Sequence, residues 1–288
     1  MLLPGSNGKI HRYDPVNSVY MGSFGLGSSS TDLEVNPSNG TVLALRGGST
    51  AIYDYSSGER LAFNASFGLS KYSMYNSAAG NFDVLYASSS SSFLDTITPS
   101  SAAYNAGPNI GVANVQSFMR FGTNSGFGLS ITAGQVNFHT WATIGFTSTQ
   151  SGPTLSSITR VSQLVRSGAT SAYYVSQTAS SASVQIVLGL GGTPSQFVAA
   201  NLSGYDFTSA IHIVAHHTGF YAVGRDASVS EYRITDLGLT PSLGLTTVST
   251  TTLSGIGYSS ARPGMVLAPE PSSMVAIAFG ALLLRRRK

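Results

Sequence analysis

A glycine-marked turn followed by an apolar strand recurs along this chain and constrains its fold more than any other feature. The turns are spaced 40 to 51 residues apart and carry Gly40, Gly80, Gly126, Gly168, Gly219 and Gly264. A second series of strands keeps step with the first: KIHRYD, which has no such strand before it, then TAIYDY, SSFLDTI, QVNFHTW, ASVQIVL and ASVSEYRI. Less regular apolar runs such as RLAFNASF follow, so each unit contains four short strands.

Four strands per unit of about 40–50 residues are typical of a β-propeller. A four-stranded sheet has two faces to bury, and blades packed face to face around an axis bury both. In TAIYDY, Ala51, Tyr53 and Tyr55 share one face, and Ile52 and Asp54 share the other. A β-sandwich gives no reason for six repeats, and the rungs of a β-helix are shorter. We therefore predict an all-β chain with a single propeller over residues 1–268, with six four-stranded blades favoured over seven.

The second unit, GTVLALRGGSTAIYDYSSGERLAFNASFGLSKYSMYNSAAG, resembles the repeats of NHL- and YVTN-type propellers. The resemblance implies that its glycine-marked strand is the inner strand of a blade. The first unit begins almost directly at its second strand, and the last unit ends in an unpartnered first strand. We predict that residues 265–268 complete the first blade and close the ring, with Met1–Leu3 as a competing remnant of the same strand.

Two groups of polar side chains have types that can support chemistry, and their positions favour structural roles for both. The segment HIVAHHTG aligns with an outer strand and turn of a blade, where His212 and His216 would lie about 13 Å apart, too far for one metal ion. We expect exposed turn histidines there. Asp14 and Asp54 follow a strand tyrosine, where an aspartate accepts backbone N–H groups of the next turn.

The sequence contains no motif that points to a catalytic, cofactor or metal site. It has no cysteine, which excludes disulfides, thiol catalysis and cysteine-ligated zinc. It also lacks a G-x-S-x-G elbow, a P-loop, a dinucleotide fingerprint and a calcium loop. The aromatic residues that would suit a sugar-binding face are better explained by packing between blades; they are Trp141 and the tyrosines at 53, 55, 173, 174 and 221.

The charge balance points away from nucleic acid. Charged residues make up 9% of the chain, against about 25% in an average soluble domain. The net charge of +3 comes from the last four residues, because without them 11 cations face 12 acidic residues. A neutral body without a basic stripe is not expected to bind nucleic acid.

The C-terminal segment PEPSSMVAIAFGALLLRRRK, residues 269–288, is set apart from the repeats. Met274 to Leu284 are 11 uncharged, mostly apolar residues. As a helix they would span about 16 Å, against a hydrocarbon core of roughly 30 Å. A permanent membrane span is therefore disfavoured. A buried core helix fits poorly between a Pro-Glu-Pro triplet and four terminal cations.

This segment resembles the PEP-CTERM sorting signal of exopolysaccharide-associated bacterial proteins, which has a Pro-Glu-Pro motif, an apolar helix and a basic end. The matching residues are Pro269, Glu270 and Pro271 for the motif, and Arg285, Arg286, Arg287 and Lys288 for the basic end. The resemblance implies export, transient membrane insertion with the basic end cytoplasmic, and recognition by an exosortase that cleaves near the motif. Residues 269–288 are accordingly assigned to this signal.

The sequence departs from that family at two points. The apolar stretch is short, and the N-terminal MLLPGSNGKIHRYD has neither the positive nor the apolar region of a signal peptide. Because an exosortase substrate has to be exported, we predict that the sequence starts late, through a misassigned start codon or truncation.

These observations predict an exported, non-enzymatic β-propeller at the cell surface or in the extracellular matrix, acting as a binding or structural module without cofactor or metal. Its expected partners are the processing exosortase and an exopolysaccharide or envelope protein. The alternative is a secreted propeller enzyme, a lyase or glycosidase acting on polysaccharide. Such an enzyme should bring acidic or histidine side chains together at one channel mouth, and single scattered carboxylates argue against it.

Overall fold

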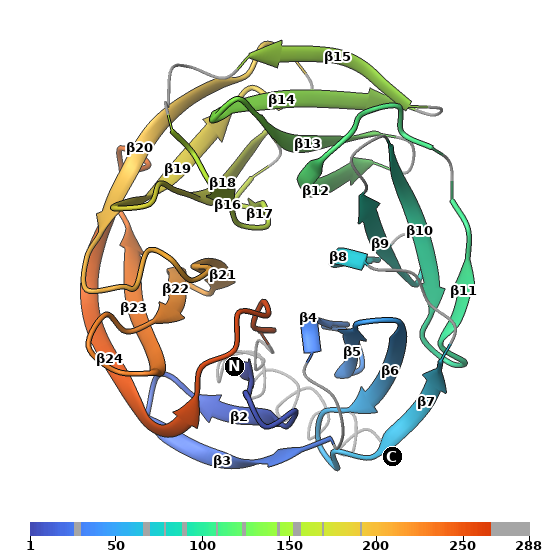
Figure 1. Cartoon of the computed structure of the whole chain (residues 1–288), viewed down its shortest axis with the longest axis vertical. Helices are drawn as coiled ribbons and strands as arrows, with labels where there is room; N and C mark the ends of the chain where they lie inside the picture. The colour runs from blue at the N-terminus through green and yellow to red at the C-terminus, as the bar shows by residue number, and fades with distance from the viewer. Residues whose placement is uncertain are drawn as a thin grey trace, which may run out of the picture.

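The computed structural model shows a ring of six antiparallel sheets (Figure 1). It describes residues 1–25, 30–65, 70–77, 79–87, 91–107, 109–122, 125–142, 145–151, 157–168, 170–190 and 192–265.

The first three blades follow one another along the chain. Blade 1 contains β1 (Leu2–Pro4), β2 (Ile10–Asp14) and β3 (Val19–Phe24). Blade 2 contains β4 (Ser30–Val35), β5 (Thr41–Arg46), β6 (Ser49–Asp54) and β7 (Arg60–Asn64). Blade 3 contains β8 (Ser70–Asn76), β9 (Asn81–Ala87), β10 (Ser92–Thr98) and β11 (Ala103–Asn105).

The last three blades complete the ring. Blade 4 contains β12 (Val115–Gly122), β13 (Ser125–Thr132), β14 (Gln135–Ala142) and β15 (Gly145–Ser151). Blade 5 contains β16 (Arg160–Val161), β17 (Val165–Arg166), β18 (Ser171–Gln177), β19 (Ala182–Leu188) and β20 (Ser195–Leu202). Blade 6 contains β21 (His212–His216), β22 (Gly219–Arg225), β23 (Glu231–Leu239) and β24 (Leu245–Gly257). In blade 5 the short strands β16 and β17 both pair with β18 and share the innermost position. The prediction of an all-β propeller with six four-stranded blades is confirmed.

Both faces of the blades are apolar, as the strand alternation predicts. Ala51, Tyr53 and Tyr55 pack into a cluster shared with blade 1, and Ile52 packs into the cluster shared with blade 3. A fully buried side chain of this size contributes about 1.5–3 kcal/mol. Every pair of neighbouring blades has such a cluster, so the ring is held by packing between its blades.

The ring closes where the two ends of the described chain meet. Leu2 N donates to Gly264 O at 2.7 Å, and Gly264 N donates back to Leu2 O at 3.0 Å. Gly264 thereby takes the innermost position of blade 1, beside β1. Met1 and Leu3 pack with Tyr232 in the cluster shared by blades 6 and 1. Closure through the C-terminal segment is thus observed at Gly264, one residue before the predicted strand 265–268.

Two details of the predicted closure need correction. Met1–Leu3 is no competing remnant, because β1 is the second strand of blade 1, outside Gly264 and next to β2. Residues 266–268, most of the predicted closing strand, lie outside the described residues, as do the sorting signal at 269–288 and its predicted helix. Within the described part of the chain, no helix is suited to crossing a membrane.

The phase of the sequence repeat was also misread. The strands marked by Gly40, Gly80, Gly126, Gly168 and Gly219 are the second strands of blades 2 to 6, and the innermost strand comes before the glycine: β4 precedes β5, and β21 precedes β22. Gly264 instead lies at the innermost position of blade 1. The innermost strands were missed because polar side chains interrupt their apolar pattern, as in STDLEV. The fourth strand of each sequence unit therefore belongs to the next blade.

The predicted turn aspartates are confirmed. Asp14 Oδ1 accepts from Val16 N at 3.0 Å and from Asn17 N at 3.2 Å. Asp54 Oδ1 accepts from Ser57 N at 2.7 Å. Hydrogen bonds from Ser56 and Ser57 lower the pKa of Asp54 to about 2. Each carboxylate therefore stabilises the turn that joins the last two strands of its blade.

Candidate functional site

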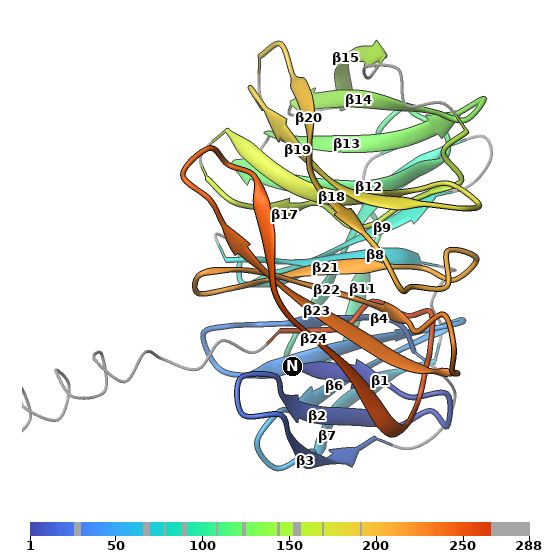
Figure 2. The same cartoon turned by 90° about the vertical axis from the view of Figure 1, so that its left-hand side faces the viewer.

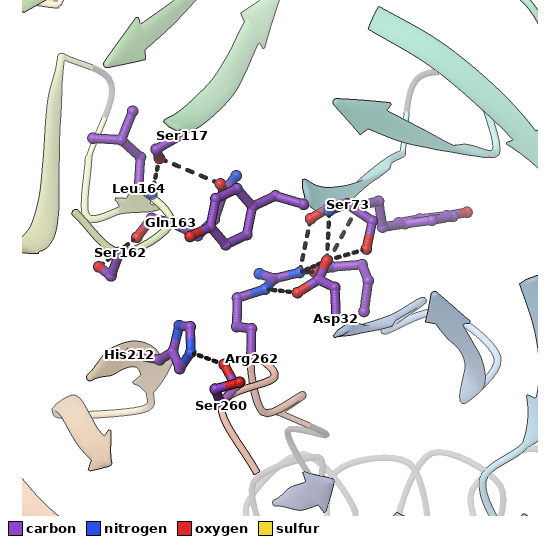
Figure 3. Close-up of polar contacts among 12 residues, drawn as sticks. Asp32, Ser73, Ser117, Ser162, Gln163, Leu164, His212, Ser260 and Arg262 are labelled. Atoms are coloured by element: carbon purple, nitrogen blue, oxygen red, sulfur yellow. Dashed lines mark hydrogen bonds and ion pairs between the residues drawn. The ribbon is translucent and has the colours of Figure 1, made fainter. Parts of the chain in front are cut away.

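The innermost strands β4, β8, β12, β16 and β21 surround the axis of the ring (Figure 1). Their polar side chains meet there although they are far apart in the sequence. Arg262, which follows β24 in the chain, also points into this centre and contacts side chains and backbone of the innermost strands (Figure 3). The centre of the propeller is therefore a polar cluster enclosed by apolar clusters between the blades.

Arg262 binds two carboxylates at this centre. Its Nε and Nη2 donate to Asp32 Oδ1 and Oδ2 at 2.6 and 3.2 Å, and Nη2 also donates to Glu34 Oε2 at 2.5 Å. The backbone N and Oγ of Ser73 donate to Asp32 Oδ2 at 2.5 and 2.6 Å. These contacts join β4 and β8 to the segment after β24, so the cluster connects blades 2 and 3 to the segment that closes the ring.

Burial governs the electrostatics of this cluster. Asp32 is 0% exposed and Arg262 is 7% exposed. Burial raises the pKa of Asp32 and of Glu34, and the Arg262 guanidinium opposes that rise. Burial also disfavours the charged guanidinium, but the two carboxylates outweigh this effect and hold the pKa of Arg262 above its usual range. The charges thus depend on one another for their stability inside the ring.

The side-chain amide of Gln163 connects blades 4 and 5, as Arg262 connects blades 2 and 3 to the closing segment. Gln163, between β16 and β17, accepts from Ser117 Oγ at 3.3 Å and donates through Nε2 to Phe118 O. Leu164 N donates to Ser117 Oγ at 2.7 Å. These bonds fix adjacent innermost strands that share no backbone ladder (Figure 3). The channel wall is therefore pre-organised on this side too.

His212, the first residue of β21, is 3% exposed and supplies a neutral base to the channel. Its Nε2 lies 3.0 Å from Ser260 O. A carbonyl oxygen only accepts, so Nε2 carries the proton and Nδ1 keeps its lone pair. Nδ1 has no hydrogen-bond partner among the described residues. Burial lowers the pKa of His212 to about 4, so the ring is uncharged at neutral pH.

The channel opens beside His212 into a cavity of ≈ 390 Å³, here called the Arg160 mouth. Its polar lining includes Tyr72, Gln116, Arg160, Gln177, His212 and Ser260. Arg160 Nη1 donates to Thr208 O. Gln177 donates to Ser209 O at 2.9 Å and accepts from Ile211 N at 2.8 Å, which fixes the loop leading into β21. Arg160 is the charged side chain among the described residues that line this mouth.

The opposite end of the channel is more apolar. A cavity of ≈ 430 Å³, the Glu34 mouth, is lined by Met74, Met119 and Met265 together with Glu34 and Arg262. The two ends of the channel thus differ chemically, since hydroxyl and amide groups surround the Arg160 mouth. The Arg160 mouth is the better candidate site, because it combines a cavity, a cation and a base.

The structure shows that the prediction of exposed turn histidines is wrong for His212. The absence of a metal site stays a prediction. His212 is not an exposed turn residue, because β21 is an innermost strand and not an outer one. His216 lies 3.1 Å from Asp236 Oδ1, on the side of blade 6. Among the described residues, no group of three or more His, Cys, Asp or Glu side chains is placed to hold a metal ion.

Sequence reasoning missed the channel residues, although a positional signal marks several of them. Asp32, Ser73, Ser117 and His212 each precede the glycine of the next turn by seven to nine residues. Each is a buried polar residue of an innermost strand. Polar residues at nearly the same position of four repeats would have indicated a shared axis if the innermost strands had been placed before the glycine.

No family model and no curated protein matches the chain. Solved structures do. A chain of a nidogen/laminin complex has 9% identity and a TM-score of 0.66, covering 93% of this chain and 99% of that one. The periplasmic gluconolactonase of Pseudomonas aeruginosa has 16% identity and a TM-score of 0.59, covering 88% and 83%. Hydrazine synthase of Kuenenia stuttgartiensis has 10% identity and a TM-score of 0.61, covering 90% and 87%. At these identities the likeness establishes the fold.

The prediction that the chain is not an enzyme is wrong. The fold is shared with proteins named as enzymes, among them the gluconolactonase and the hydrazine synthase. The prediction also relied on single, scattered carboxylates. The structure instead brings Asp32 and Glu34 together on Arg262 inside the channel.

Proposed function

We propose that this chain is an exported β-propeller that binds a sugar acid or its lactone at the Arg160 mouth. The observation that carries the proposal is the unpartnered Nδ1 of His212 in a buried ring that lines the cavity. A buried polar atom without a partner costs about 1–3 kcal/mol. A ligand hydroxyl that reaches this buried nitrogen from the cavity and donates to it would recover that cost.

The lining selects the class of ligand. Arg160 offers one positive charge, which suits a single carboxylate. Gln116 and Ser209 offer neutral donors and acceptors of the kind that a polyol chain needs. The mouth has no acidic residue among its described lining.

Calorimetric titration of the full chain with gluconate, glucuronate and glucose tests this function. We expect the two acids to bind and glucose to bind at least tenfold more weakly. Arg160→Met should lower the affinity for the acids, and Arg166→Met, which removes a cation at the Glu34 mouth, should not. Equal binding of glucose and the acids, or no binding by any of them, would contradict the proposal.

Lactone hydrolysis is the second candidate function, favoured by the neutral state of His212. In this reaction His212 Nδ1 takes a proton from water as the water oxygen bonds to the lactone carbonyl carbon. The ring C–O bond then breaks, and the proton passes to the departing alkoxide, which yields the hydroxy acid. Acid release from glucono-δ-lactone should exceed the uncatalysed rate in the wild type and return to it in His212→Gln. Equal rates in both would remove this candidate.

We also propose that residues 269–288 direct the protein to the cell surface by exosortase processing. The support is the order of Pro269–Pro271, an apolar run and a basic end in the sequence. Expression of the full chain behind a secretory leader, in hosts with and without an exosortase, tests this. We expect a product shortened near Pro271 only in the first host, and uncut protein after Pro269, Glu270 and Pro271 are all changed to alanine. Identical masses in both hosts would contradict processing.

A further inference from the structure

A second cleft lies at the seam of the ring, away from the channel. The outermost strand of blade 6, β24, runs beside β2 and β3 of blade 1 (Figures 1 and 2). Between them is a cavity of ≈ 430 Å³. Its walls include His11, Tyr13 and Tyr20 from blade 1, and Thr251, Leu253 and Ser254 from β24.

Tyr20 presents an aromatic surface in this cleft. It is 51% exposed, an unusual amount for an aromatic ring in a chain whose other large rings mostly fill the core. Its hydroxyl lies 3.2 Å from His11 Nδ1, and the two ring centroids are 5.9 Å apart. His11 is itself buried, and its Nε2 would lie 2.5 Å from a Cβ at position 5, where the chain has glycine. The ring of Tyr20 is thus held in place by a buried neighbour.

The opposite wall carries hydroxyl groups. Thr251 and Ser254 are on β24, and the structure shows no partner for either hydroxyl among the described residues. Buried Leu253 and Tyr13 form an apolar floor between the two walls. An aromatic face, an apolar floor and free hydroxyls together match a ligand that has both C–H faces and hydroxyl groups.

The cleft is uncharged at neutral pH. None of the described residues that line it is acidic, lysine or arginine. Burial, with a smaller effect of Lys9, lowers the pKa of His11, so this ring is neutral as well. A charged ligand would lose hydration here without gaining an ion pair. The cleft therefore differs from the Arg160 mouth in the charge of the ligand that it suits.

We propose that this cleft binds a neutral oligosaccharide, with a sugar ring stacked on Tyr20 and its hydroxyls bonded to Thr251 and Ser254. The site is independent of the proposed function at the Arg160 mouth, because the two cavities share no lining residue. Two separate sites on one propeller would let the protein hold a glycan chain at its seam while a small acid occupies its channel.

Titration of the full chain with maltohexaose, cellohexaose and laminarihexaose tests this site. We expect at least one of them to bind, Tyr20→Ala to weaken that binding at least tenfold, and Tyr20→Phe, which keeps the ring, to stay within about threefold. Phe197→Ala is the matched control, since Phe197 is 56% exposed on the outer strand β20 of blade 5.

The remaining variants separate the two proposed sites. Thr251→Val should weaken glucan binding without a change in melting temperature, and Arg160→Met should leave glucan binding unchanged. The proposal is overturned if none of the three glucans binds, if Phe197→Ala weakens binding as much as Tyr20→Ala, or if Arg160→Met abolishes it.

Discussion

Removal of the Arg262 side chain is expected to destabilise the propeller strongly, because it leaves two carboxylates inside the ring without their cation. Arg262→Met keeps the apolar stem and deletes the four bonds that reach Asp32, Glu34 and the Ser73 carbonyl at 2.5–3.2 Å. Breaking a buried ion pair by removing one partner costs about 3–5 kcal/mol. That is a large share of the roughly 5–15 kcal/mol that stabilises a typical domain.

The loss should depend on pH in a defined direction. Burial raises the pKa of Asp32 and Glu34 in the folded state. A carboxyl group with a raised folded pKa stabilises the protein below its unfolded pKa and loses that contribution as the pH rises through the folded pKa. Without Arg262 to oppose it, the rise in pKa is larger. The variant should therefore lose less stability at pH 5 than at pH 7.5.

Urea unfolding followed by fluorescence of Trp141, the single tryptophan, measures this loss. The matched control is Arg60→Met, an exposed arginine on β7 of blade 2, which should change the free energy of unfolding by less than about 0.5 kcal/mol. A combined Asp32→Asn and Arg262→Met variant should be more stable than Arg262→Met alone, because it removes one buried charge. A loss below about 1 kcal/mol at pH 7.5, or one independent of pH, would refute the reasoning.

Two further predictions follow from buried groups. The pKa of His212 is lowered from 6.5 to about 4 by burial, so protonation of this ring is linked to unfolding. The wild type should therefore lose stability as the pH falls from 6.5 towards 4, by up to about 3 kcal/mol from this group. In acid unfolding, the stability of His212→Gln should fall less steeply over that pH range, and an unchanged slope would contradict the assignment. A Cβ at Gly126 would lie 2.2 Å from the Trp141 ring, whereas one at Gly47 would meet nothing within 4 Å. Gly126→Ala should therefore cost about 1–3 kcal/mol with a shift in tryptophan emission, and Gly47→Ala should leave both unchanged; equal effects of the two would show that Trp141 packs elsewhere.

The architecture was predictable from the sequence because one physical requirement repeats along it. Blades 2 to 6 each carry a glycine at or near the start of their second strand, and at Gly40 and Gly80, with φ of 72° and 68°, the glycine allows a tight turn. Apolar residues on alternate positions then define the strands that follow. The spacing of these turns therefore favoured six blades over seven.

The candidate site was not predictable, because it depends on how the ring closes. Asp32 and Arg262 are 230 residues apart, and no local pattern links them. The innermost strand that carries Asp32, STDLEV, also has a polar pattern, and Arg262 lies after the last strand. The wrong phase of the repeat placed His212 on an outer strand, so the base of the Arg160 mouth was not predicted.

The state of the His212 ring tests the central claim most directly. Long-range ¹H–¹⁵N NMR spectra of the full chain at pH 7, assigned with His212→Gln, report the protonation of both ring nitrogens. The account predicts a neutral ring with the proton on Nε2, and a shift of the Nδ1 resonance on addition of gluconate. A protonated His212, or an Nδ1 resonance that stays unchanged while calorimetry shows the protein saturated with gluconate, would contradict it.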